Sequence, residues 1–99
     1  MGVRTIKAAQ ELMKKLYFSK DLSRGKERTV LKLVEELGEL SEAVLLKNID
    51  KISEEIADVI AWILSVANLY EIDVDEAFNL KYKGVCPECN KCPCVCESI

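Results

Sequence analysis

The sequence predicts an all-α fold: an antiparallel bundle of about four helices, completed by homo-oligomerisation. Apolar residues recur at spacings of three and four along most of the chain, which is the period of one helix face. No segment alternates apolar and polar residues in the way that a half-buried strand does, and both prolines, Pro87 and Pro93, follow the last helical pattern. We expect one domain over residues 1–84 and a short cysteine-rich tail over residues 85–99.

The first two predicted helices are separated by a polar segment. The first extends from about Thr5 to Ser19, and KDLSRGKE then interrupts the pattern, with Gly25 marking a loop. The second extends from about Glu27 to Lys47, because its apolar residues form one stripe. That stripe consists of Val30, Leu33, Val34, Leu37, Leu40 and Val44.

Capping residues mark the last two predicted helices. Asp50 follows the break at KNID and is a candidate N-cap for a helix from about Lys51 to Tyr70. Asp73 and Glu76 form a capping-box-like pair at the start of the fourth helix, and Gly84 suits the position just past its end. Because the connections are short, we expect consecutive helices to pack antiparallel.

The third predicted helix carries information about assembly. Residues 56–69 read IADVIAWILSVANL, which is apolar on nearly every side, and such a helix is buried on nearly every side. Three other short helices offer little cover, so we expect a homodimer or a homotetramer, with Trp62, Leu64 and Leu69 as interface candidates. The alternative is that these three residues belong to the core of a single chain.

Composition narrows the class of protein. The chain has 99 residues and a net charge of −3, and we expect no general nucleic-acid binding because such proteins are usually basic. The longest apolar run, residues 56–70, is too short and too polar to cross a bilayer, so we expect no membrane partner. The first twenty residues are amphipathic and lysine-rich, unlike a secretory signal. A cytoplasmic location is therefore expected, and there cysteines bind metals more often than they form disulfides.

The segment EELGELSEAV, residues 35–44, has features that weaken an isolated helix. Its glutamates lie at spacings that place like charges on neighbouring positions, and each such pair costs a few tenths of a kcal/mol. Gly38 adds a cost of about 0.5–1 kcal/mol relative to alanine. A positive species other than a side chain would offset this repulsion.

A second acidic pair mirrors the first across the predicted turn. Glu39 lies eight residues before Lys47 and Glu55 eight after it, while Glu36 lies eleven before and Asp58 eleven after. In an antiparallel hairpin the two pairs face each other at the seam between the helices. Carboxylates gathered there repel one another, and Mg²⁺ prefers such oxygen ligands. We predict a Mg²⁺ site, with Mn²⁺ as an alternative ion; a solvated acidic surface is the other interpretation.

These residues also carry a resemblance to a known family. VEELGELSEAV followed by EEIADVIAWILSVANL resembles the MazG family of nucleotide pyrophosphohydrolases, within the all-α NTP pyrophosphohydrolase superfamily. The family motif is EExxE, a spacer and then ExxD. It falls here on Glu35, Glu36 and Glu39, and then on Glu55 and Asp58. The resemblance covers about residues 5–84.

The resemblance implies an activity and a set of metal ligands. The activity is Mg²⁺-dependent hydrolysis of a nucleoside triphosphate to a monophosphate and pyrophosphate, in nucleotide-pool cleaning or control. The implied metal ligands are Glu36, Glu39, Glu55 and Asp58. Metal ions neutralise phosphoryl oxygens and activate water. Since the chain has no histidine, we expect a metal-bound water as nucleophile, helped by the catalytic carboxylate of Glu36 or Glu39.

The resemblance further implies that Asn68 and Lys81 contact the nucleotide. A buried, fully hydrogen-bonded amide and a solvated lysine are the alternatives for these two residues. Arg24, Lys26 and Arg28 precede or begin the second helix and could meet phosphate, or simply belong to a solvated loop.

The tail CPECNKCPCVC contains all five cysteines. Its opening CPxC followed by Asn resembles a zinc knuckle, and Cys86, Cys89, Cys94 and Cys96 can supply four thiolates to a tetrahedral Zn²⁺. Cys92 is then spare. An iron–sulfur cluster is the second interpretation, and a tail of free thiols is the third.

Two other functions remain open at this point. One is a non-catalytic module, either a metal-dependent nucleotide sensor or a zinc-tail adaptor. The other is a phosphoribosyl-ATP pyrophosphohydrolase, which would share the same carboxylates.

Overall fold

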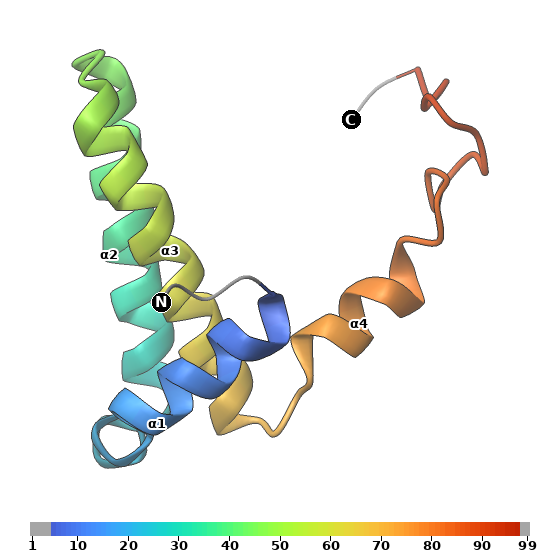
Figure 1. Cartoon of the computed structure of the whole chain (residues 1–99). Coiled ribbons are helices and arrows are strands. Elements are labelled where there is room, and N and C mark those ends of the chain that lie inside the picture. Colours follow the sequence, from blue (N-terminus) through green and yellow to red (C-terminus); the bar gives the residue numbers. More distant parts are fainter. Residues whose placement is uncertain (1–4, 98–99) are drawn as a thin grey trace.

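The computed structural model describes residues 5–97, which form four α-helices and, within that range, no β-strand. In chain order these are α1 (Ile6–Arg24), α2 (Lys26–Leu45), α3 (Ile49–Leu69) and α4 (Val74–Lys81) (Figure 1). The all-α prediction is confirmed. Residues 1–4 and 98–99, at the outer ends of the predicted domain and tail, lie outside the described residues. None of the described helices has the length and hydropathy of a membrane span.

Helix α1 is longer than predicted. Thr5 caps it, with its Oγ1 accepting a hydrogen bond from the Ala8 N–H at 3.0 Å. The helix continues to Arg24, so the predicted end at Ser19 was wrong. The segment KDLSR is polar but contains no helix breaker, and an Asp21–Arg24 ion pair of 2.7 Å lies within it. Gly25 ends the helix at φ +94°, a conformation that favours glycine, so the predicted break there is confirmed.

The turn between α2 and α3 differs from the prediction in one residue. Lys47 adopts a φ of 56°, and Asn48 caps α3 by accepting a hydrogen bond from the Lys51 N–H at 3.1 Å. Asp50 is therefore not the N-cap. It lies in the first turn of α3, where a negative charge complements the helix dipole.

Helix α4 begins as predicted and ends earlier. The Asp73 carboxylate accepts a hydrogen bond from the Glu76 N–H at 3.2 Å, which confirms the predicted cap. The helix ends at Lys81, short of the predicted end at Gly84, because the backbone of Tyr82 is extended.

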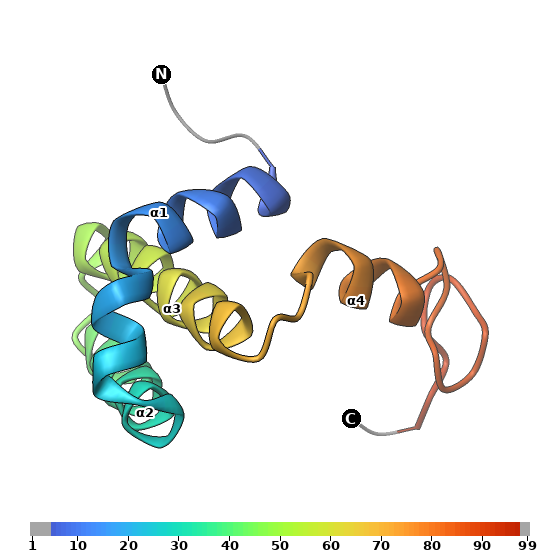
Figure 2. The ribbon, with the colours of Figure 1, turned by 90° about the horizontal axis from the view of Figure 1, so that it is seen from below.

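Helix α1 packs on the antiparallel α2–α3 hairpin at the end away from the α2–α3 turn, mainly against α3, whereas α4 packs mainly against α1 (Figures 1 and 2). The expected antiparallel packing of α4 on α3 is therefore absent. Gln10 of α1 fixes the chain after α3 instead. Its Nε2 donates to the Ile72 carbonyl at 2.6 Å, and its Oε1 accepts from the Val74 N–H at 3.0 Å. These bonds direct α4 and the tail away from the hairpin.

The apolar core of the single chain is small. Its buried hydrophobic residues are Ala43, Val59, Leu64, Ala67 and Leu69. Leu64 and Leu69, predicted as interface candidates, are thus already covered within the chain, and Trp62 is half-buried. Many larger aliphatic side chains of α2 and α3 remain exposed.

Candidate active site

Three of the four predicted carboxylates meet between α2 and α3. Glu36, Glu39 and Glu55 each place one carboxylate oxygen within 4.8 Å of the other two. Glu36 is half-buried, Glu39 exposed and Glu55 buried. The helix register that was predicted by counting residues on either side of Lys47 therefore brings these three side chains together.

Helical spacing explains how the acids reach this position. The buried and half-buried residues of α2 recur at spacings of four and three: Thr29, Leu33, Glu36, Leu40 and Ala43. A matching series on α3 consists of Ile52, Glu55, Val59, Trp62 and Val66. Glu36 and Glu55 thus stand in the middle of the covered stripes, where an apolar residue would ordinarily pack. The stripe predicted for α2 from the sequence instead contains Val34 and Leu37, which are exposed, and leaves out Glu36.

Two carboxylate oxygens in this group have no partner. Oε2 of Glu36 and Oε2 of Glu55 are buried and accept no hydrogen bond from any described residue. The other oxygen of Glu55 lies 3.7 Å from the Lys51 ammonium, on the same helix. Buried carboxylate oxygens without donors are costly, so the site favours either a proton or a cation.

The electrostatics of Glu36 report this cost. Burial, followed by the neighbouring carboxylates of Glu39, Glu55 and Asp58, raises the pKa of Glu36 from 4.5 to about 7. A protonated Glu36 can also donate to Glu39 or Glu55. Near neutral pH the group is therefore ready to exchange a proton for a metal ion.

Asp58 lies next to the three-glutamate group rather than within it. It is exposed and lines a pocket of about 300 Å³ between α1 and α3, with Tyr17, Lys20, Arg24 and Trp62 also on the wall. A second pocket, of about 390 Å³, adjoins Glu39 and Glu55 at the turn end of the hairpin. The carboxylates are therefore reachable from two sides.

The wall of the first pocket contains an arrangement that the sequence did not predict. Asp21 is only 1% exposed, and its carboxylate binds Arg24 Nη1 at 2.7 Å. The Arg24 guanidinium also stands 4.8 Å from the Trp62 ring centroid, and the buried Thr29 hydroxyl donates to the Gly25 carbonyl at 2.8 Å. The i, i+3 spacing of Asp21 and Arg24 was the available signal, but KDLSR had been assigned to a break.

The remaining predicted contact residues lie elsewhere. Asn68 is 7% exposed, and both ends of its amide bond Gln10: Oδ1 accepts from Nε2 at 3.1 Å and Nδ2 donates to the backbone carbonyl at 3.2 Å. Lys81 is exposed at the end of α4, with its ammonium 5.8 Å from the Tyr82 ring centroid. The Lys26 ammonium stands 4.7 Å from the Tyr70 ring centroid, and Arg28 is exposed. Nucleotide contacts by Asn68 and Lys81 stay predictions.

Comparison with known families identifies the family of the chain. A family model described as the MazG nucleotide pyrophosphohydrolase domain matches residues 24–90. That range contains α2, α3 and α4, with both acidic pairs. The chain belongs to the MazG family. A search of curated proteins found no match.

Membership of the MazG family fits the chemistry of the carboxylate group. The family is generally metal-dependent, and the two unpartnered buried oxygens of Glu36 and Glu55 are what a hard cation would satisfy. The matched range omits most of α1. The pocket beside Asp58, which α1 helps to form, therefore draws much of its wall from outside the family match.

A second group of potential metal ligands lies in the tail. Four sulfur atoms lie within 4.8 Å of one another: those of Cys86, Cys89, Cys94 and Cys96. Cys92 is exposed and lies outside this group. The selection of four cysteines predicted from spacing is the set that the fold brings together.

Proposed function

We propose that the protein is a Mg²⁺-dependent nucleoside triphosphate pyrophosphohydrolase that releases a monophosphate and pyrophosphate, in nucleotide-pool cleaning or control. The observation that carries this proposal is the pair of buried, unpartnered oxygens of Glu36 and Glu55 inside a three-glutamate group. Such an arrangement is unfavourable unless a cation or a proton occupies it. A cytoplasmic location belongs to the proposal, because a reducing compartment keeps cysteines free for metals.

Glu36, Glu39, Glu55 and Asp58 would hold Mg²⁺, or Mn²⁺ in its place. The bound ion would neutralise phosphoryl oxygens and lower the pKa of a water molecule. A carboxylate of Glu36 or Glu39 would accept the proton of the attacking water, and a base with a pKa near the working pH is efficient in this role.

The pocket beside Asp58 supports a place for the rest of the nucleotide. Lys20 supplies positive charge at its wall, while Tyr17 and Trp62 offer aromatic surface. The Arg24 guanidinium is held between Asp21 and Trp62, so it is oriented before substrate arrives. Asn68 and Lys81 are kept as proposed nucleotide contacts by resemblance to the family.

Pyrophosphate release from a panel of nucleoside triphosphates, including modified ones and phosphoribosyl-ATP, tests this proposal. Release should require Mg²⁺ or Mn²⁺. Glu39→Gln should lower it at least about 100-fold, since a lost metal ligand removes several kcal/mol of charge stabilisation. Glu42→Gln, on the same helix but outside the three-glutamate group, is the matched control. Metal-dependent nucleotide binding without pyrophosphate release would instead identify a sensor module.

A second copy of the chain is part of the proposed enzyme. The Cα radius of gyration is 15.7 Å, against about 13 Å for a compact domain of this length. The accessible surface is 7881 Å², against about 5,700 Å² for a monomer of this mass. The excess of about 2,200 Å² per chain lies in the range that obligate dimers bury.

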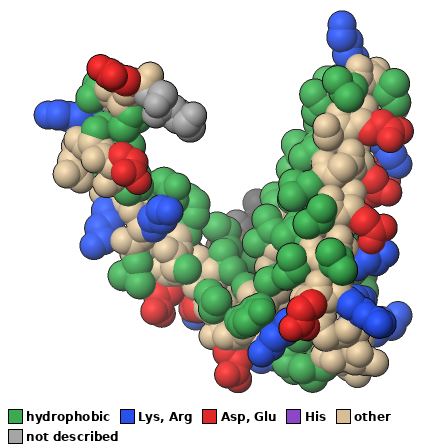
Figure 3. Space-filling view, turned by 180° about the vertical axis from the view of Figure 1, so that it is seen from behind, with side chains coloured by type: hydrophobic (Ala, Val, Ile, Leu, Met, Phe, Trp, Pro, Cys, Tyr) green, Lys and Arg blue, Asp and Glu red, His purple; other side chains and the backbone are tan. Residues whose placement is uncertain are grey.

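The exposed aliphatic side chains indicate where that copy would bind. Those on α2 include Val30, Val34, Leu37 and Val44, and those on α3 include Ile56, Ile60 and Ile63. Each set recurs at helical spacings and so forms one stripe. Figure 3 shows hydrophobic side chains gathered along the hairpin, on the side that faces α4 and the tail. A homodimer would cover these stripes, and a homotetramer is the larger alternative.

Light scattering after size-exclusion chromatography tests the assembly. Ile60→Glu should convert the oligomer to a monomer, because it buries a charge in the proposed interface. Ser19→Glu adds the same charge to α1 and should leave the mass unchanged. A monomeric wild-type chain at micromolar concentration would contradict the proposal.

A further inference from the structure

The geometry of the cysteine tail indicates ligand spacing rather than disulfide bonding. The Sγ atoms of Cys86 and Cys96 lie 3.8 Å apart, and those of Cys89 and Cys94 lie 4.0 Å apart. A disulfide requires about 2.05 Å. Four sulfurs at about 2.3 Å from a tetrahedral Zn²⁺ are separated by about 3.8 Å. Both measured separations therefore approximate the edge of a tetrathiolate tetrahedron.

The backbone supports this arrangement. Asn90 follows the first cysteine pair with φ 60°, a left-handed conformation that Asn tolerates better than most residues. The Asn90 N–H donates to the Cys86 carbonyl at 2.8 Å, and the Cys86 N–H donates to the Lys91 carbonyl at 2.9 Å. These two hydrogen bonds close a tight loop that turns Cys86 and Cys89 toward the second pair.

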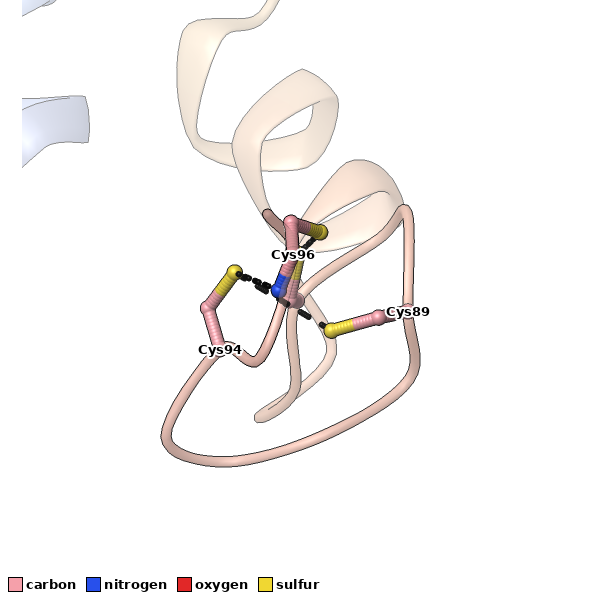
Figure 4. Close-up of side chains that lie close together, drawn as sticks. Cys89, Cys94 and Cys96 are labelled. Carbon is pink, nitrogen blue, oxygen red and sulfur yellow. Dashed lines mark hydrogen bonds between the residues drawn. The ribbon is translucent and has the colours of Figure 1, made fainter. Parts of the chain in front are cut away.

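Backbone amides also point at the sulfurs. The Val95 N–H donates to Cys89 Sγ at 3.5 Å, and the Cys96 N–H donates to Cys94 Sγ at 3.3 Å. Figure 4 shows Cys89 and Cys94 reaching toward each other across the loop, with Cys96 between them. Amide donors of this kind stabilise thiolate charge and orient metal ligands. Cys92 lies between the two pairs in sequence and is exposed, outside the group.

We propose that the tail binds one Zn²⁺ per chain through Cys86, Cys89, Cys94 and Cys96, as a closed structural site distinct from the carboxylate group. Four thiolates fill every position of a tetrahedral ion, which leaves none for substrate. Thiolates select soft ions, whereas the carboxylate oxygens suit Mg²⁺ or Mn²⁺. The chain therefore separates two metals by ligand chemistry.

The structure also indicates why the tail needs an ion. Residues 85–97 contain no helix and no fully buried residue in the described range, and Val85 and Val95 are exposed. A segment without an apolar core has little to offset its conformational entropy. Metal binding supplies folding free energy directly in such segments.

Elemental analysis of the full-length protein, purified under reducing conditions, tests this site. We expect one zinc per chain in the wild type and in Cys92→Ser, and none in Cys89→Ser. Replacement by Co²⁺ should give the absorption of a tetrahedral thiolate complex in the wild type and Cys92→Ser alone. Circular dichroism should show that Cys89→Ser keeps its helices, because α1–α3 do not include the tail.

Four results would overturn the proposal. Iron in place of zinc would assign the thiolates to another metal site, and absence of metal would leave free thiols. A mass showing two disulfides in protein kept from air would assign the cysteines to covalent pairs. Zinc lost in Cys92→Ser but kept in Cys89→Ser would refute the choice of ligands.

Discussion

Replacing Glu36 by Gln should stabilise the metal-free protein at alkaline pH while weakening its metal site. Gln keeps the shape of the side chain but cannot ionise. Burial and the neighbouring carboxylates raise the pKa of Glu36 from 4.5 to about 7, so ionised Glu36 costs the folded state free energy. At 1.36 kcal/mol per pKa unit, the upper limit of this free-energy cost is roughly 3 kcal/mol. Because the side chain is only half-buried, solvent screening reduces this to about 1–2 kcal/mol.

The pH dependence has a definite sign. A carboxyl whose folded-state pKa is raised binds more protons when folded than when unfolded. Its contribution to stability is fully present below pH 4.5 and is lost as the pH rises through about 7. Glu36→Gln should therefore change the free energy of unfolding little at pH 4.5 and raise it by about 1–2 kcal/mol at pH 8.

Urea unfolding in Mg²⁺-free buffer measures this difference. The buffer should contain no chelator, because a chelator would remove the Zn²⁺ proposed for the tail. Glu35→Gln is the control, because Glu35 is exposed and lies next to Glu36 in sequence. Added Mg²⁺ should stabilise the wild type more than Glu36→Gln, following the mass action of a ligand that binds only the folded state. An equal effect of Glu36→Gln at both pH values, or destabilisation at pH 8, would refute the electrostatic argument.

Three further changes have expected outcomes. Gly38→Ala should raise the free energy of unfolding by about 0.5–1 kcal/mol, since an added Cβ meets no atom within 4 Å; destabilisation, measured by urea, would indicate that a second chain approaches there. Asp21→Ala should lower it by about 3 kcal/mol, because Arg24 loses its partner in a mostly buried pair; a loss below 1 kcal/mol would contradict this. Truncation after Gly84 should preserve pyrophosphate release within about twofold unless the tail also holds the oligomer together, because the carboxylate chemistry uses no tail residue.

The hairpin and the meeting of three glutamates were predictable because both follow from periodicity. In two antiparallel helices joined by a short connection, the position of the turn determines which residues lie at the same height. Once the turn is placed near Lys47, the heights of Glu39 and Glu55 follow at 1.5 Å per residue. The same arithmetic also placed Asp58 in the group, opposite Glu36. In the structure Asp58 is exposed and lines the pocket next to α1 instead.

The end of α1 and the position of α4 were not predictable in this way. Helix α1 continues through KDLSR because a local ion pair and the absence of Gly or Pro outweigh the loss of apolar spacing. The position of helix α4 depends on Gln10, whose side chain forms hydrogen bonds with the backbone of Ile72 and Val74, more than sixty residues away in sequence. No local pattern reports a hydrogen bond between such distant residues.

The position of the acids also explains the exposed surface of the hairpin. Glu36 and Glu55 occupy positions that an isolated hairpin would fill with aliphatic residues, and the aliphatic residues beside them, such as Leu37 and Ile56, are exposed. When carboxylates occupy the central positions between two packed helices, the chain has less apolar surface to bury within itself. The proposed second copy would supply further hydrophobic stabilisation, so the proposed metal site and the proposed oligomer would have one structural cause. Ile60→Glu should accordingly lower the thermal stability of the hairpin and also reduce the mass measured by light scattering to that of a monomer. Saturating Mg²⁺ should recover part of the stability without restoring the oligomer, because the ion relieves the carboxylate repulsion and leaves the aliphatic stripe uncovered.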